Sequence, residues 1–400
     1  MSYTCTFPRS LTRGSACAVA VLAALGLALT QLAVADDDLA RPQALASAGP
    51  SAPENIGAYP RHENHPTKKW VARLRSEPMS YELQHWACYH ESHAPQAVAL
   101  EGQIGMTVPS GANWYSNGFF NFALDDQEGR NFAVKAVRAI DSGERASCEF
   151  LWELPQAWVR VRFLVVPGRF PLFCAITQYP KGEQVPVLRL RLACYPGGYF
   201  RDGLRVARTP VRVVRVGERP ELDPVKESSV MLYDEKYDLG VEGSEGGCGA
   251  LVVADGVGRS SLDIGSYGCF WNLEAKPGIK ELRLAFWDGL RMKNADLVPC
   301  LEAEFAAAAP YLVALDFNPL MFRESSVAGT LGELEKLIAE TQDSAAEAEA
   351  LRGLQARLAE LRPRVTGATV DLEAEDEYLQ ALQQLDKLLW QLRMKWVFAD

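Results

Sequence analysis

Three histidines that lie close together in the sequence offer acid–base or metal chemistry. His85, His90 and His93 fall within nine positions, and all five histidines of the chain lie between residues 62 and 93. Imidazole changes charge near neutral pH and is the commonest metal ligand in proteins. We therefore name His85, His90 and His93 as candidate catalytic or sugar-contacting residues. Two alternatives stay open: the cluster holds a metal, or its members are incidental surface and turn residues.

The spacing of this cluster argues against a metal centre. Cys88, His90 and His93 do not form the two distant ligand pairs of a standard zinc framework. On a strand, His90 and His93 would point to opposite faces, so a common site would need a loop there. The sequence also contains no P-loop and no Gly-rich dinucleotide fingerprint after a strand. We predict neither a metal nor a cofactor.

Two aromatic turns offer the chemistry of sugar binding. One spans residues 113–118, and the other spans residues 195–201 and adds arginine. An aromatic ring can cover the apolar face of a pyranose, while amides and guanidinium groups bind its hydroxyls. The alternative is that the first turn is only a tight connection with Trp114 anchored in the core. The predicted ligand-binding residues are Trp114, Tyr115, Asn117, Tyr199, Arg201 and Arg205.

Arginine is concentrated between residues 189 and 219. Eight arginines and no lysine occur there: Arg189, Arg191, Arg201, Arg205, Arg208, Arg212, Arg215 and Arg219. Guanidinium groups bind carboxylate and sulfate at two points, so this segment could form a cationic face for an acidic polysaccharide. The alternation of these arginines with Val and Leu is equally consistent with a solvated outer sheet face.

The cysteines bear on disulfide bonding. Cys174 and Cys194 flank the turn at 179–183, and Cys248 and Cys269 flank the turn at 255–258. Residues opposite each other on a hairpin lie close enough for a disulfide to span them. We name Cys174–Cys194 and Cys248–Cys269 as candidate disulfides. Buried free thiols are the alternative.

The first residues indicate export. Arg9 and Arg13 precede an apolar run at 16–35, which ends on Ala-Val-Ala before three aspartates. This pattern is typical of a cleaved signal peptide, so we predict a signal at 1–35, a periplasmic or secreted protein and no retained membrane anchor. Residues 36–66 are rich in Pro and Ala and are predicted to be a disordered leader.

The remaining chain is predicted to form two structural regions. From residue 67 to 325, short stretches of period-two alternation are separated by turns rich in Gly and Pro. This pattern predicts a large antiparallel β-sandwich that ends in a short helix at 294–315. From 326 to 400 the period becomes helical, which predicts an antiparallel helical hairpin with coiled-coil-like packing, its first arm broken near Asp343. The hairpin is either structural or a site of homo-oligomerisation.

A sandwich of this size with one open outer face resembles, at the level of fold alone, the large-sandwich carbohydrate enzymes. These include the mutarotase-like aldose epimerases and some polysaccharide lyases. The net charge of −10 argues against nucleic acid as the main partner. The first hypothesis is an exported protein that binds or processes an acidic or neutral glycan. The alternative is a non-catalytic envelope or scaffold protein whose hairpin joins partners, and the sequence leaves enzymatic activity undecided.

Overall fold

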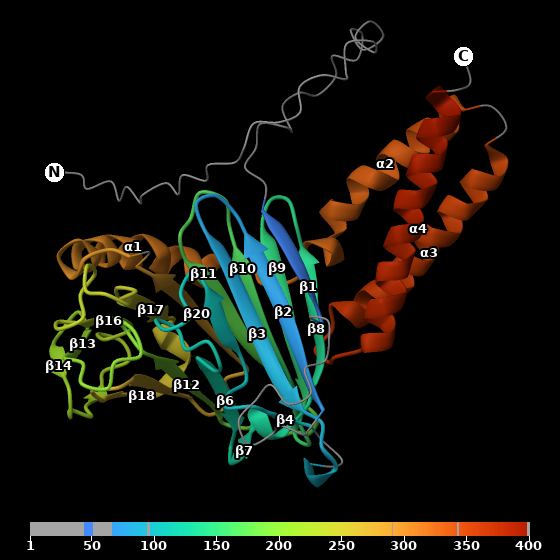
Figure 1. The fold of residues 1–400 in the computed structure, drawn as a ribbon. Coiled ribbons are helices and arrows are strands. Elements are labelled where there is room, and N and C mark those ends of the chain that lie inside the picture. Colours follow the sequence, from blue (N-terminus) through green and yellow to red (C-terminus); the bar gives the residue numbers. More distant parts are fainter. Residues whose placement is uncertain (1–43, 51–65, 94–96, 290, 342–343, 398–400) are drawn as a thin grey trace, which may run out of the picture.

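The fold is mainly β, as the sequence predicts. The computed structural model describes residues 44–50, 66–93, 97–289, 291–341 and 344–397. Within these residues, the strands form three antiparallel sheets of nine, six and five strands, followed by helices (Figure 1). The predicted signal peptide and most of the predicted leader lie outside the described residues.

The nine-stranded sheet forms one layer of a sandwich. Its strand order is β14-β13-β16-β17-β20-β11-β10-β9-β8. In that order the strands are Val213–Arg215, Arg205–Arg208, Ser229–Asp234, Cys248–Val252, Glu281–Asp288, Leu172–Pro180, Ala157–Val165, Ala146–Glu153 and Val134–Asp141.

The two smaller sheets together form the second layer. The five-stranded sheet packs on β8, β9 and β10, and the six-stranded sheet faces the other part of the nine-stranded sheet (Figure 1). The five-stranded sheet contains β1 Leu45–Pro50, β2 Thr67–Arg75, β3 Ser80–Cys88, β4 Val98–Ala99 and β5 Gly105–Val108. The six-stranded sheet has the order β15 Glu221–Leu222, β18 Val257–Ile264, β19 Cys269–Ala275, β12 Leu188–Cys194, β6 Phe120–Leu124 and β7 Gln127–Glu128.

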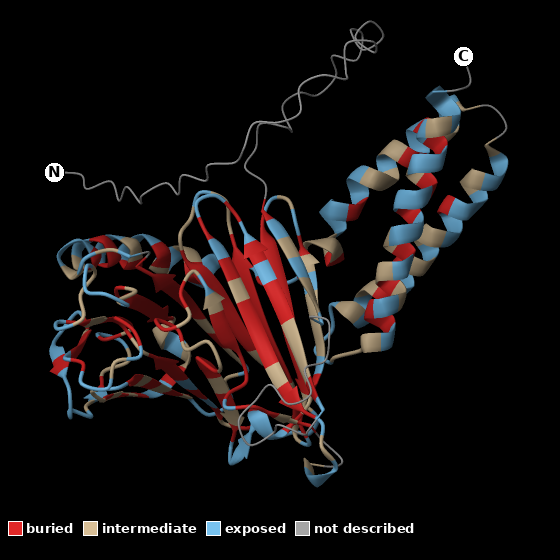
Figure 2. Cartoon of the chain, in the orientation of Figure 1, coloured by how far each residue is buried: buried red, intermediate tan, exposed pale blue. Residues whose placement is uncertain are grey.

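Alternation along the strands builds the core between the layers. In β12, Leu188, Leu190 and Leu192 are buried in the core, while Arg189 and Arg191 point to the opposite face and are exposed. Successive residues of a strand point to opposite faces, so each strand contributes one apolar row to this core. Figure 2 shows the buried residues concentrated between the sheets.

The outer face of the nine-stranded sheet is covered by helices. Helix α1 (Asn294–Ala314) packs on β16, β17 and β20, and Leu301 and Phe305 join Phe173 and Trp287 in a second core. By length and composition α1 could cross a membrane, but here its apolar side chains pack against the sheet. The predicted helix at 294–315 is therefore present and covers a sheet face.

The C-terminal region forms a bundle of three helices. These are α2 (Glu324–Glu340), α3 (Ala345–Val365) and α4 (Leu372–Val397). The predicted first arm of the hairpin comprises α2 and α3, which the predicted break separates, and the predicted second arm is α4. The first arm folds back on itself, because Leu334 and Leu337 of α2 share one core with α3 and α4. Arg362 near the end of α3 reaches Glu324 at the start of α2, 2.8 Å away, so these helices are antiparallel.

The prediction of a disordered leader is wrong for residues 45–50. Residues 45–50 form strand β1, which pairs with β2 along its whole length, and Ala44 exchanges backbone hydrogen bonds with Gly143. The segment has only one large apolar side chain, Leu45, and that side chain is exposed. Backbone pairing at a sheet edge, which composition does not report, therefore orders this stretch.

Candidate functional site

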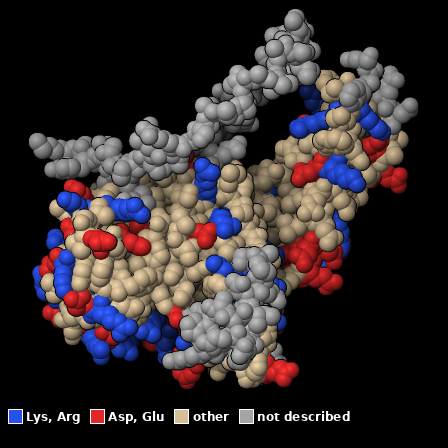
Figure 3. All heavy atoms as spheres, in the orientation of Figure 1, with Lys and Arg blue, Asp and Glu red and all other residues tan. Residues whose placement is uncertain are grey.

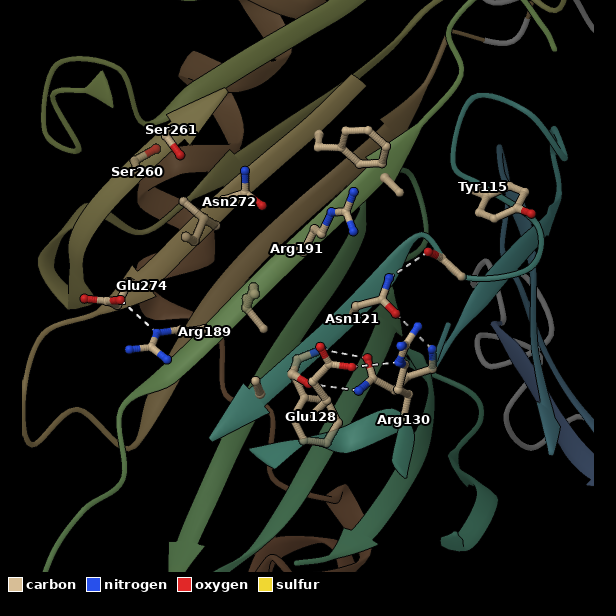
Figure 4. Close-up of a pocket in the computed structure, with 18 of the residues that line it drawn as sticks. Tyr115, Asn121, Glu128, Arg130, Arg189, Arg191, Ser260, Ser261, Asn272 and Glu274 are labelled. Atoms are coloured by element: carbon tan, nitrogen blue, oxygen red, sulfur yellow. Dashed lines mark hydrogen bonds and ion pairs between the residues drawn. The ribbon is translucent and has the colours of Figure 1, made fainter. Parts of the chain in front are cut away.

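A groove of about 570 Å³ lies on the open outer face of the six-stranded sheet. Outward-pointing side chains of β6, β12, β18 and β19 line it, and loops at 101–103 and 115–118 close one end (Figure 4). In Figure 3, basic side chains gather along the lower edge of the molecule, below the position of β12 and β18 in Figure 1. The groove is open because no helix of the described chain packs on this face.

One row of polar side chains crosses the groove from strand to strand. Arg191 of β12 pairs in register with Asn121 of β6 on one side and with Asn272 of β19 on the other. Asn272 in turn pairs with Ser261 of β18. Residues directly opposite each other in antiparallel strands have their side chains on the same face. The row Asn121–Arg191–Asn272–Ser261 therefore presents guanidinium, amide and hydroxyl groups to a single ligand.

Ion pairs occupy the neighbouring row, and one of them extends to Glu221, which lies opposite Ser261 at the end of the polar row. Arg189 lies two residues before Arg191 on the same face, and its Nε lies 2.9 Å from the Glu274 carboxylate. Arg259 pairs with Glu221 at 3.0 Å, and Arg130 pairs with Glu128 at 2.7 Å. The hydrogen bond to Glu274 raises the pKa of Arg189. These pairs form one rim of the groove.

Tyr115 and Tyr195 line one end of the groove and belong to a cluster of four tyrosines. The centroids of Tyr115 and Tyr195 are 4.9 Å apart, and those of Tyr195 and Tyr199 are 5.2 Å apart. Tyr267 contacts Tyr195 at 4.9 Å, and the Arg201 guanidinium lies 5.4 Å from the centre of the Tyr267 ring. Burial and then the nearby Tyr267 raise the pKa of Tyr195 to about 12, so its hydroxyl stays neutral at physiological pH.

The predicted residues Tyr115, Tyr199 and Arg201 meet in this tyrosine cluster. The Tyr115 hydroxyl donates to the Glu101 carboxylate, and the Tyr199 hydroxyl donates to the backbone carbonyl of Gly111. Asn117 lies beside them in the same turn and is half-buried. Of these predicted residues, Tyr115 lines the groove, whereas Asn117, Tyr199 and Arg201 do not. The second turn contributes Tyr195 instead, so two segments about 80 residues apart in the sequence meet at this end of the groove.

Arg205 is in a different position from the predicted one. It is completely buried, pairs with Asp234 at 2.5 Å and donates to the carbonyls of Pro196, Gly198 and Phe200. The prediction that Arg205 contacts a ligand is wrong, because the side chain is fully buried and both of its Nη atoms are bonded inside the protein. It holds the 195–201 loop, and with it Tyr195 and Tyr199, in place.

Trp114 is also a core residue. Its side chain is 1% exposed, and its indole N–H donates to the carbonyl of Trp287 at 3.0 Å. Its ring packs against Phe286 with centroids 5.2 Å apart. The alternative interpretation of this turn, with Trp114 as an anchor, is the one that the structure has, and Trp114 cannot reach a ligand.

The three histidines do not converge on one cleft. His85 is buried in β3 between Trp70 and Trp152, and burial lowers its pKa to about 4 although its Nδ1 donates to the Gln103 carbonyl. His90 is bonded to Ser92 in an exposed connection, and His93 ends a 3-10 helix there. None of them lines the groove. The expectation of a shared histidine site is wrong, since the sheet core holds His85 alone.

No metal site accompanies these residues. Among the residues that the structure describes, no group of three or more His, Cys, Asp or Glu side chains could hold a metal ion.

The predicted disulfides are absent. Cys174, Cys194, Cys248 and Cys269 are free and buried. The turns at 179–183 and 255–258 do not close hairpins, because at each of them the chain crosses from the nine-stranded to the six-stranded sheet. Cys194 instead lies opposite Cys269 in the pairing of β12 with β19. Burial raises the pKa of Cys174 and Cys194 well above the usual value, so these thiols are unreactive fillers of the core.

The arginine-rich segment does not form one continuous surface. Arg189 and Arg191 lie in the six-stranded sheet, whereas Arg205, Arg208 and Arg215 belong to the nine-stranded sheet. Only the first two line the groove. The sequence analysis did not single out their partners Asn121, Phe270 and Asn272, and the signal that could have found Asn272 and Phe270 is the alternation along 269–275.

Comparisons with known proteins give distant structural neighbours alone. No family model matches the chain, and no curated protein matches it. A putative aldose 1-epimerase from Klebsiella pneumoniae is 9% identical, with 66% of this chain and 87% of that chain covered and a TM-score of 0.36. A GH36 α-galactosidase from Geobacillus stearothermophilus is 10% identical, with 55% and 40% covered and a TM-score of 0.28.

A further GH36 α-galactosidase structure from Geobacillus stearothermophilus, in complex with raffinose, is 11% identical, with 54% of this chain covered and a TM-score of 0.30. This chain spans 40% of the length of these galactosidases. The neighbours are thus glycoside hydrolase and aldose epimerase chains. TM-scores this low support no inference about function, and the candidate site is based on the geometry of this chain alone.

Proposed function

We propose that this protein binds a carbohydrate in the groove of the six-stranded sheet. One observation carries the proposal: Tyr115 and Tyr195 line the same groove as the polar row Asn121–Arg191–Asn272–Ser261. Aromatic rings provide an apolar platform for the C–H face of a sugar ring. Amide, hydroxyl and guanidinium groups provide donors and acceptors for its hydroxyl groups. The two kinds of contact lie on neighbouring parts of one surface.

The groove favours binding over catalysis. General acid–base chemistry needs a carboxyl or imidazole group that is free to exchange a proton with the substrate. Glu274, Glu221 and Glu128 are each held by an arginine, and Glu101 accepts from Tyr115. The histidines lie elsewhere. We therefore propose a binding role and assign no catalytic residue.

The test compares tyrosines inside and outside the groove. In the variant Tyr115→Ala/Tyr195→Ala, we expect binding to any glycan that the wild type recognises on an array to weaken about tenfold or more. The control is Tyr89→Ala, because Tyr89 is 41% exposed and does not line the groove. Equal binding by the double variant and the wild type would overturn the proposal, as would a wild type that binds no glycan.

A second candidate function concerns the three-helix bundle. Trp390 is 62% exposed and Trp396 is 49% exposed, both on α4. Exposed tryptophans on a helix are typical of surfaces that bind another protein. In this alternative the protein is a non-catalytic scaffold that joins partners, including a second copy of itself, through the bundle. Light scattering of the wild type and of Trp390→Glu tests the homo-oligomer, which the substitution would dissociate.

The site of action is proposed from the sequence. The pattern at 1–35 supports export and a periplasmic or secreted protein. Mass spectrometry of the protein purified from its native cells tests this. A mature chain that begins after Ala35 supports export, and an intact chain that starts at Met1 contradicts it.

A further inference from the structure

The four arginines that line the groove fall into two kinds. Arg130, Arg189 and Arg259 each pair with a glutamate of the groove at 3.0 Å or less. The guanidinium of Arg191 makes no hydrogen bond or ion pair within the described chain, and Figure 4 draws no dashed line to it. Its charge is therefore not neutralised by a neighbour. All four side chains line the same groove, so the lack of an ionic partner is specific to Arg191.

The position of Arg191 is fixed although it lacks an ionic partner. Its guanidinium carbon lies 4.0 Å from the centre of the Phe270 ring, which belongs to the adjacent strand β19. Stacking on a ring leaves the N–H edge of a guanidinium free to donate. A stacked arginine also loses less side-chain freedom on binding a ligand, because it is already ordered.

The cross-strand neighbours of Arg191 are neutral. Asn121 and Asn272 lie opposite it on the two flanking strands. The side-chain amide of Asn121 is already bonded to the backbone of Gly118 and Gln103, whereas the side chains of Asn272 and Ser261 make no hydrogen bond within the described residues. The amide of Asn272 therefore adds unused N–H donors next to the unused fork of Arg191.

We propose that Arg191, with Asn272 beside it, binds an anionic group of the saccharide, a carboxylate or a sulfate ester. The proposal rests on the proposed function, since it names the class of sugar that the same groove takes. A guanidinium group binds two oxygens of a carboxylate or sulfate in a planar two-point contact. The glutamates of the groove do not compete for Arg191, because each has its own partner. The ligand is thus a uronic-acid or sulfated saccharide.

The test uses matched polymers and matched arginines. Polygalacturonate and alginate supply carboxylates, and dextran sulfate supplies sulfate esters. Methyl-esterified polygalacturonate and dextran are the neutral counterparts. Affinity electrophoresis at constant ionic strength compares the wild type, Arg191→Gln and Arg189→Gln, with calorimetry on soluble oligomers of each polymer that binds. Both substitutions remove one positive charge from the same face of β12, but Arg189 is already paired with Glu274.

We expect the wild type to bind at least one anionic polymer more tightly than its neutral counterpart. Arg191→Gln should weaken this binding by about 10–100-fold, because it removes charge-assisted hydrogen bonds. Arg189→Gln should weaken it by less than about threefold. The anionic polymers that bind distinguish a carboxylate from a sulfate site.

Two results would overturn the inference while the proposed function stands. One is equal binding of anionic and neutral polymers, unaffected by Arg191→Gln. The other is an equal loss in both arginine variants, which would mean that only long-range charge attracts the polymer. Failure of the wild type to bind any of the polymers would count against both the inference and the proposed function. Thermal unfolding of each variant confirms that it is folded.

Discussion

The two outer faces of the sandwich begin from the same sequence pattern and end in opposite states. Strand β10 contains Val159-Arg160-Val161-Arg162, and strand β12 contains Leu188-Arg189-Leu190-Arg191. In both strands the aliphatic residues enter the core between the sheets and the arginines point outward. The side chains of Arg160 and Arg162 are only 5% and 11% exposed, whereas the side chain of Arg189 is 45% exposed.

The difference comes from a distant segment of the chain. On the β10 face, Glu149 of β9 lies 3.1 Å from Arg160 and 2.8 Å from Arg162, and Glu375 of α4 pairs with Arg138 and Arg160. The first turn of α4 thus covers this face, and its Glu375 forms ion pairs with the arginines there. No helix of the described chain covers the β12 face. Alternation predicts which side chains point away from the core. Whether a helix packs over them then determines whether they form buried ion pairs or remain open to a ligand.

The buried network should matter most for stability. Burial alone would raise the pKa of Glu149, but the charges of Arg162, Arg160 and Arg138 outweigh it and hold that pKa below the ordinary value. Glu149→Gln leaves these buried arginines without their shared partner. We expect a loss of about 3–5 kcal/mol in the free energy of unfolding, measured by urea denaturation.

The matched control on the open face is Glu274→Gln. It removes the partner of Arg189 in a solvated pair, so the expected loss is about 0–1 kcal/mol. If Glu149→Gln does not fold, Glu375→Gln tests the same point, since Arg138 and Arg160 then keep Glu149. Equal losses on the two faces would show that the cover by α4 makes no difference to these charges.

The burial of His85 in the five-stranded sheet should make the stability of the protein depend on pH. Its folded pKa of about 4 lies below the ordinary value of 6.5, so the neutral form stabilises the fold. This contribution is complete above about pH 6.5 and is lost as the pH falls toward 4, by about 3 kcal/mol at most. The midpoint temperature of thermal unfolding should therefore fall less steeply between pH 7 and pH 4 in His85→Gln than in the wild type.

Glu149 adds a separate dependence at lower pH. Because its folded pKa is lowered, its contribution is present above the ordinary value of 4.5 and is lost as the pH falls below it. The two groups therefore act in adjoining ranges. Parallel pH curves for the wild type and His85→Gln between pH 6.5 and pH 4.5 would contradict the burial of an unprotonated His85.

The smallest effect is expected on the open face. Arg191→Gln should change the free energy of unfolding by less than about 0.5 kcal/mol, because the side chain is exposed and unpaired. The comparison variant Arg160→Gln, from the same pattern in β10, should cost several times more because it breaks buried pairs with Glu149 and Glu375. A large loss in Arg191→Gln, measured by urea denaturation, would mean that Arg191 serves the fold.

The sequence predicted what depends on local pattern. Alternation indicates β10 and β12, the helical period indicates the bundle, and the aromatic turns contain Tyr115 and Tyr195, which line the groove. Local pattern does not report which sheet a strand joins, so it predicts hairpins at the turns beside Cys174 and Cys248 where the chain changes sheets. It also does not report remote partners. Arg205 was therefore assigned to a ligand, although Asp234 and three carbonyls already bind it.

The central claim is that the open face of the six-stranded sheet is the ligand-binding face. Hydroxyl-radical footprinting with a bound glycan tests it most directly, because aromatic side chains report their own exposure. A ligand in the groove should protect Tyr115, Tyr195 and Phe270 from oxidation and leave Tyr89 and Trp390 unchanged. Protection of Trp390 and Trp396 on the bundle, with no change at the tyrosine cluster, would contradict it.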